Sequence, residues 1–115
     1  MTAAGTLWHI TLLVAGAPVE GAALRRALQQ LCDRDPGNMG ARFRVDGAEL
    51  QFWDEGHDIE QVTRAALSLW PSDRRAVGLP DWALVGIQVL DRNGWRERRA
   101  VLAAPIAPGT VMPVG

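Results

Sequence analysis

The sequence predicts an α+β fold of the ferredoxin-like class, a βαββαβ sandwich in which two helices cover one face of a four-stranded antiparallel sheet. Two observations lead to this prediction. Between residues 7 and 90 the apolar residues change period in the order strand, helix, strand, strand, helix, strand. Glycine and proline residues mark most of the changes, and a hairpin signal joins the two middle strands. We therefore expect one domain over residues 1–94 and an extended C-terminal tail over residues 95–115.

The first strand and the first helix follow from the change of period within residues 7–32. Residues 7–14 alternate between two partly apolar faces, which is typical of a central strand. Leucines at helical spacing then predict a helix over residues 19–32. Asp35-Pro36-Gly37 should end this helix, because the residue before a proline is driven to extended geometry.

Residues 41–53 predict a β-hairpin closed by a two-residue turn at Asp46-Gly47. Such a turn sets the register of the two strands and places Val45 opposite Ala48 on the buried side. The other pairs expected in this register are Phe43 with Leu50, Ala41 with Phe52, Arg44 with Glu49, and Arg42 with Gln51.

The second helix is predicted from Asp58, which together with Gln61 resembles a capping box. Apolar residues at helical spacing continue this helix to about Trp70. Pro71 should end it, because proline lacks the N–H that a helix interior uses.

Residues 82–90 predict the last strand, with Val85 facing inward and Leu84 facing outward. The residues beyond it include three prolines and little charge after Arg99. This composition favours an extended arm over a further helix or strand.

Composition narrows the function classes. The chain has 115 residues and a formal net charge of −1, so no global field gathers nucleic acid or an anionic membrane. Cys32 is the one cysteine, which fits a reducing compartment, and we expect a cytoplasmic protein. No apolar run approaches the ~20 residues of a membrane span, so no membrane association is expected.

Several short stretches resemble a family of short, uncharacterised actinobacterial proteins. They are Trp8-His9-Ile10-Thr11, Phe52-Trp53-Asp54-Glu55, Leu69-Trp70 and the run from Leu79 to Arg92. The likeness covers about residues 7–92. It implies one bacterial domain, and it implies no catalytic or binding residue because the family has no known activity.

The main functional hypothesis concerns the outward residues of the central strands. Together they would leave an apolar patch on the helix-free sheet face, and such patches usually mark interfaces. We expect a non-catalytic protein-interaction module that pairs with a second copy, since closed twofold pairs are the commonest assemblies. Alternatively, the chain's own tail, residues 95–115, or another protein covers this face. The predicted interface residues are His9, Leu13, Arg42, Arg44, Gln51, Trp53 and Leu84.

RNA or a small molecule could instead bind the same face. In that case Trp53 would stack on a base, and Arg42, Arg44 and the arginines of residues 96–99 would contact phosphates. The chain lacks the aromatic and glycine pattern of RNA-recognition domains and is slightly acidic, which disfavours nucleic acid.

A small enzyme using His9 and the loop of residues 54–58 is the third hypothesis. From Asp54 to Asp58 the loop gathers three carboxylates and an imidazole, a mixture suited to acid–base chemistry or a divalent metal. Asp58 is needed as a helix cap, however, and no His/Cys pair lies at ligand spacing. The sequence therefore favours a non-enzyme, predicts no metal or cofactor, and leaves catalytic residues unassigned.

Overall fold

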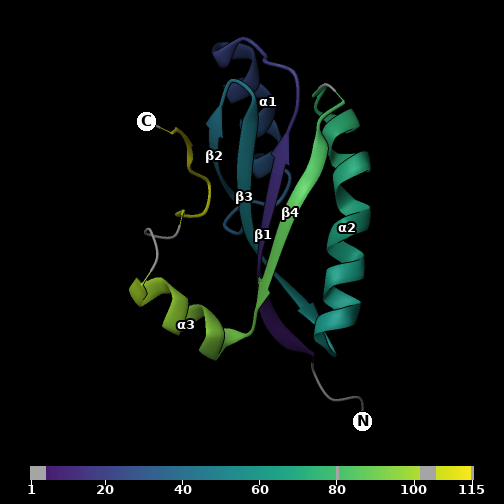
Figure 1. The fold of residues 1–115 in the computed structure, drawn as a ribbon, viewed down its shortest axis with the longest axis vertical. Helices are drawn as coiled ribbons and strands as arrows, with labels where there is room; N and C mark the ends of the chain where they lie inside the picture. The colour runs from purple at the N-terminus through teal and green to yellow at the C-terminus, as the bar shows by residue number, and fades with distance from the viewer. Residues whose placement is uncertain (1–4, 80, 102–105, 115) are drawn as a thin grey trace.

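A computed structural model describes residues 5–79, 81–101 and 106–114. The elements within these residues are β1 (Thr6–Ala15), α1 (Gly21–Asp33), β2 (Gly40–Arg44), β3 (Gly47–Gly56), α2 (Ile59–Ala76), β4 (Ala83–Leu90), α3 (Arg92–Val101) and β5 (Val111–Pro113). The five strands form one sheet in the order β4-β1-β3-β2-β5 (Figure 1).

The prediction of a four-stranded antiparallel, ferredoxin-like sheet with two helices is wrong. The sheet is mixed, because β5 pairs with β2 in parallel while the other neighbouring strands are antiparallel. A third helix, α3, follows β4. The fifth strand forms because Val111 pairs with Ala41 and buries its side chain in the core.

The prediction of an extended arm from residue 95 is wrong for the helix within it. Asp91 starts α3: its carboxylate accepts a hydrogen bond from the Gly94 N–H at 2.7 Å, and its carbonyl accepts one from the Trp95 N–H at 2.9 Å. A side-chain acceptor of this kind satisfies the free N–H groups of a first helical turn. The turn signal at residues 91–94 is therefore a helix start.

The core lies between one face of the sheet and the pair α1 and α2, whose buried residues form one cluster with those of the strands. The main members are Ile10, Leu12 and Val14 of β1, Leu24, Leu28 and Leu31 of α1, and Val62, Ala66 and Trp70 of α2. Figure 1 shows α3 on the opposite side of the sheet from α2. We call the sheet face opposite α1 and α2 the outer face.

The hairpin forms, but its predicted register is wrong. Val45 and Asp46 make the turn, and Arg44 pairs with Gly47. The carbonyls of both turn residues accept hydrogen bonds from the connection between β1 and α1, Asp46 from Gly16 at 3.1 Å and Val45 from Val19 at 2.7 Å. These long-range bonds hold the turn one residue earlier than its local sequence favours. The observed pairs are Phe43 with Ala48, Arg42 with Glu49, Ala41 with Leu50, and Gly40 with Gln51.

The inward and outward assignments in the first part of β4 are also wrong. The register with β1 shifts at one point, so that Leu13 pairs with Gly86 and Val14 with Leu84. Val85 is the extra residue of this bulge and is 64 % exposed, whereas Leu84 packs against the core. A bulge reverses the alternation of the residues before it.

The predicted cap of α2 is confirmed, and its predicted end is wrong. The Asp58 carboxylate accepts a hydrogen bond from the Gln61 N–H at 2.8 Å. The helix then runs through Pro71 to Ala76. Trp70 supports this continuation, because its buried side chain donates a hydrogen bond to the Trp82 carbonyl at 2.8 Å.

Candidate functional site

The centre of the outer face holds three aromatic rings from three elements. His9 of β1 lies opposite Trp53 of β3, with ring centroids 5.1 Å apart and an edge-on geometry. Trp95 of α3 packs against both, 5.7 Å from His9 and 5.3 Å from Trp53. The helix thus covers two residues that the sequence predicts at an intermolecular interface.

His9 is consequently shielded from water. Its exposed fraction is 7 %, and burial lowers the pKa of its imidazole from 6.5 to about 4. Removing a charged imidazole from water is costly, which is why the neutral form is favoured. The geometry suits His9 to packing between tryptophans.

Trp53 is held in place from the backbone. The Asn38 amide donates to the Trp53 carbonyl at 2.9 Å, and its oxygen accepts from the Trp53 N–H at 2.8 Å. The same amide group also donates to Asp35 at 2.6 Å. This support fixes the strand that carries the indole.

Gln51 is held by the C-terminal segment, by which we mean residues 106–114. Its side-chain oxygen accepts a hydrogen bond from the Ile106 N–H at 3.1 Å, and its amide donates to Glu49 at 2.8 Å. A Cβ added at Gly40 would lie 2.6 Å from the Ala107 carbonyl oxygen, so the segment passes directly over this glycine. The segment therefore covers a second part of the outer face.

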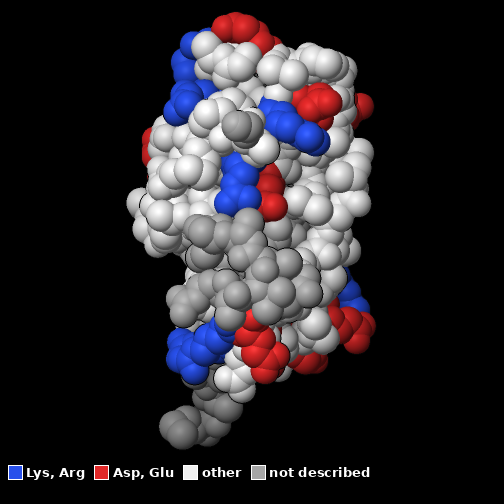
Figure 2. Space-filling view, turned by 60° about the vertical axis from the view of Figure 1, so that its left-hand side comes forward, with Lys and Arg blue, Asp and Glu red and all other residues white. Residues whose placement is uncertain are grey.

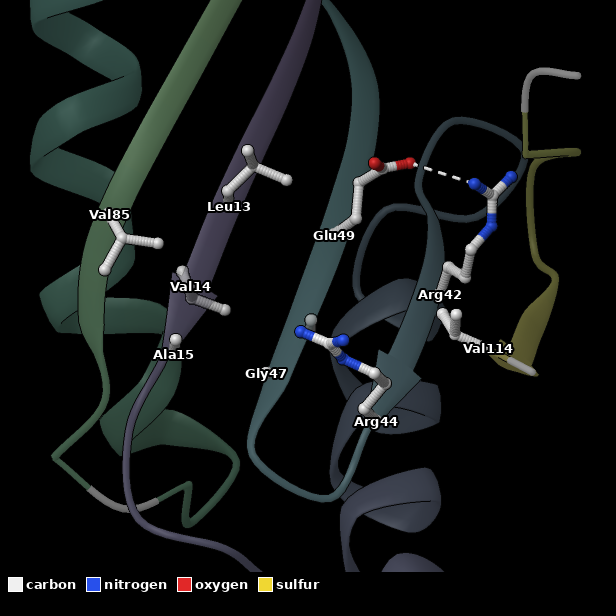
Figure 3. Close-up of a pocket in the computed structure, with 10 residues that line it drawn as sticks. Leu13, Val14, Ala15, Arg42, Arg44, Gly47, Glu49, Val85 and Val114 are labelled. Atoms are coloured by element: carbon white, nitrogen blue, oxygen red, sulfur yellow. Dashed lines mark ion pairs between the residues drawn. The ribbon is translucent and has the colours of Figure 1, made fainter. Parts of the chain in front are cut away.

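Another part of the outer face is hollow. A depression of about 340 Å³ is lined by Leu13, Val14, Ala15, Arg42, Arg44, Gly47, Ala48, Glu49, Val85 and Val114 (Figure 3). Three of its apolar side chains are well exposed: Leu13 at 41 %, Val85 at 64 % and Val114 at 47 %. Both predicted interface arginines, Arg42 and Arg44, also line this hollow.

The charges of the hollow balance one another. Arg42 lies 3.6 Å from Glu49, and Arg44 lies 3.8 Å from Asp46. Figure 2 shows blue and red side chains interspersed over this side of the molecule. Neither sign dominates, which gives no basic stripe for a phosphate backbone.

The seven predicted interface residues thus fall into three groups. Leu13, Arg42 and Arg44 line the open hollow. His9, Gln51 and Trp53 contact the chain's own C-terminal elements, and Leu84 belongs to the core side. The side chains of Arg98 and Arg99 lie outside the described part of the structure.

The loop of residues 54–58 is organised by backbone contacts. Asp58 caps α2, Asp54 accepts from the Glu55 N–H at 2.9 Å, and Gln61 accepts from the His57 N–H at 2.6 Å. Strand alternation directs Asp54 toward the helix side and His9 to the outer face, so the two do not share a site. Among the described residues no group of three or more His, Cys, Asp or Glu side chains is suited to hold a metal.

Sequence reasoning misses Trp95, Val85 and Val114 as parts of the outer face. Trp95 follows a turn signal and has no apolar stripe around it. A helix start at Asp91, with a backbone donor three residues on, is the one local signal that points to it.

Comparison with known protein families identifies one match. A family model described as a domain of unknown function, DUF8830, matches residues 7–105. No curated protein and no solved structure shows a significant match to the chain. The expected likeness to an uncharacterised family is thereby confirmed. Separately, no helix within the described residues is long and apolar enough to cross a membrane.

Proposed function

This chain belongs to the DUF8830 family, a domain of unknown function, and we propose that it is a non-catalytic protein-interaction module that pairs with a second copy of itself. The hollow of the outer face carries the proposal. It places exposed Leu13, Val85 and Val114 beside two arginine–carboxylate pairs, on a part of the sheet that α3 does not line and that Val114 of the C-terminal segment borders.

The charge pattern favours a second copy over a partner of one sign. The two arginines and two carboxylates sum to zero, and the ion pairs are long, at 3.6 and 3.8 Å. Under a twofold rotation the arginine of one copy can approach a carboxylate of the other. Such an isologous surface meets no net repulsion from itself, and opposite charges across it set the register.

The edge strand β4 adjoins the hollow and would enlarge the contact between two copies. β4 lies at one end of the strand order and contributes Val85 to the hollow. Its sequence, ALVGIQVL, has no charged residue. Exposed edge strands of monomers are usually protected by charge or proline, so an uncharged edge beside an apolar hollow is typical of a surface that a partner covers.

The test is the oligomeric state of matched variants. Leu13 in the hollow and Leu67 on α2 have similar exposed fractions, 41 % and 45 %. We expect wild-type protein and Leu67→Glu to be dimers by sedimentation velocity, and Leu13→Glu to be a monomer. A monomeric wild-type protein over the whole accessible concentration range, or a dimeric Leu13→Glu, would overturn the proposal.

We also propose a cytoplasmic location and an actinobacterial source. The location is supported by Cys32, which is buried and whose pKa burial raises to about 11. A buried thiol with a raised pKa stays protonated and unreactive, so it serves as a packing residue and needs no disulfide partner. The source is supported by the stretches around Trp8 and Trp82 that resemble an actinobacterial family.

A further inference from the structure

A second depression lies beside the aromatic cluster, at the start of α3. It has a volume of about 360 Å³ and is lined by Leu7, Trp53, Arg92, Trp95 and Arg96. The two indoles meet at 64° with centroids 5.3 Å apart, so they form a corner. Leu7, which is 43 % exposed, adds a further apolar wall.

The two arginines give this pocket a positive charge. Arg92 and Arg96 are four residues apart on α3 and therefore project from the same side of the helix. Neither forms an ion pair with a carboxylate of the described residues. Two acidic groups near the pocket have other donors: Glu55, opposite Leu7 in the sheet, accepts from the Gly5 N–H at 2.9 Å, and Asp91, next to Arg92, caps α3. Glu97 follows Arg96 in the sequence but does not line the pocket.

The geometry points to a binding site for a small anion that carries a flat aromatic ring, of the size of a nucleoside monophosphate or an aromatic carboxylate. The ring would lie in the corner of Trp53 and Trp95, where each indole offers an apolar face. The anionic group would meet Arg92 and Arg96, whose guanidinium forks match carboxylate and phosphate oxygens. This site is separate from the dimer surface, which it shares no lining residue with.

The size of the pocket decides between a small ligand and a polymer. Ligand pockets span roughly 300–1,000 Å³, and this one lies near the lower limit. A nucleic-acid strand needs a longer positive track, whereas the arginines of the hollow are paired with carboxylates. The pocket therefore suits one ring and one anionic group.

Tryptophan fluorescence tests the site directly, because two indoles line it. Wild-type protein is titrated with adenosine monophosphate, salicylate, adenosine and inorganic phosphate. We expect saturable quenching by one or both ring-bearing anions, and weaker binding of adenosine and of phosphate alone. The response to the two anions distinguishes a nucleotide from an aromatic acid. Added salt should weaken binding.

Matched arginine variants supply the control. We expect the double variant Arg92→Gln/Arg96→Gln to bind at least roughly tenfold more weakly than wild type, since two charge-assisted contacts are lost. Arg26→Gln/Arg75→Gln makes the same change of charge at exposed positions on α1 and α2 and should bind like wild type. Indole N–H resonances in NMR spectra report whether Trp53 and Trp95 keep their packing. Adenosine binding as tight as that of the tighter ring-bearing anion, loss of binding in the control alone, no saturable response, or binding only to a single-stranded RNA oligonucleotide would overturn the inference.

Discussion

The Asn38 side chain takes the place of a strand neighbour for Trp53. The register of β2 and β3 pairs Gly40 with Gln51, and its continuation would place residue 38 opposite residue 53. There the amide of Asn38 makes both hydrogen bonds, at 2.8 and 2.9 Å, that a paired backbone would make. The ladder thus extends beyond the end of β2, at the position that supports the aromatic cluster.

Asn38→Ala should lower the free energy of unfolding by about 1–3 kcal/mol, because it removes both bonds to a partly buried backbone. Asn93→Ala, at an exposed position of α3, is the control and should change it by less than about 0.5 kcal/mol. Urea unfolding measures both. Equal stability of the Asn38 variant and wild type would contradict this role.

Acid should destabilise the protein through His9. Burial lowers the pKa of His9 from the ordinary 6.5 of an exposed histidine to about 4 in the fold, so the unfolded chain binds more protons than the folded one between these pH values. The contribution of His9 to the free energy of unfolding is therefore complete above pH 6.5. It is lost as the pH falls toward 4, with a slope of up to about 1.4 kcal/mol per pH unit. Unfolding free energies measured across this range for wild type and His9→Leu isolate the effect, since carboxylates titrate in both. A difference between the two proteins that is independent of pH would count against it.

Gly40→Ala should displace the C-terminal segment. The added Cβ would lie 2.6 Å from the backbone oxygen of Ala107 and 2.7 Å from Ile106, so the backbone itself must move. Gly21→Ala is the control, because its Cβ meets nothing within 4 Å. Hydrogen exchange should become faster over residues 106–114 in the first variant only. Unchanged exchange in Gly40→Ala would show that the segment does not pack there.

Pro71→Ala should stabilise α2. Proline within a helix removes one backbone hydrogen bond and costs about 3 kcal/mol relative to alanine, partly offset by the freer unfolded chain. We expect a net gain of about 1–2 kcal/mol in the free energy of unfolding, measured by urea unfolding. Ser72→Ala, next to it and also exposed, should change stability much less. A lower stability of Pro71→Ala would mean that the ring makes contacts that outweigh the lost bond.

Local chemistry predicted the elements well where one residue type decides the outcome. Asp58 caps α2 as expected, because a side-chain acceptor three residues before a free N–H needs no tertiary context. Pro71 shows the opposite case. Its local cost is outweighed by the burial of Trp70 one residue earlier, which sequence alone cannot weigh.

The site was predicted in part for the same reason. Strand alternation correctly put Leu13, Arg42 and Trp53 on one face. Alternation carries no information about a bulge, so Val85 was missed in favour of Leu84. It also says nothing of what covers a face, and Trp95 reaches His9 only through the path of the chain after Leu90.

One wall of the hollow, formed by Val114, is present only while β5 stays paired with β2. Val111 joins Ala41 across most of the length of the chain, and three residues of pairing must repay the entropy of closing that long loop. We therefore expect β5 to open locally more often than the other strands. Each opening removes Val114, whose N–H bonds the Phe43 carbonyl at 2.8 Å, from the rim. Docking of a second copy and closure of the last strand should then reinforce each other.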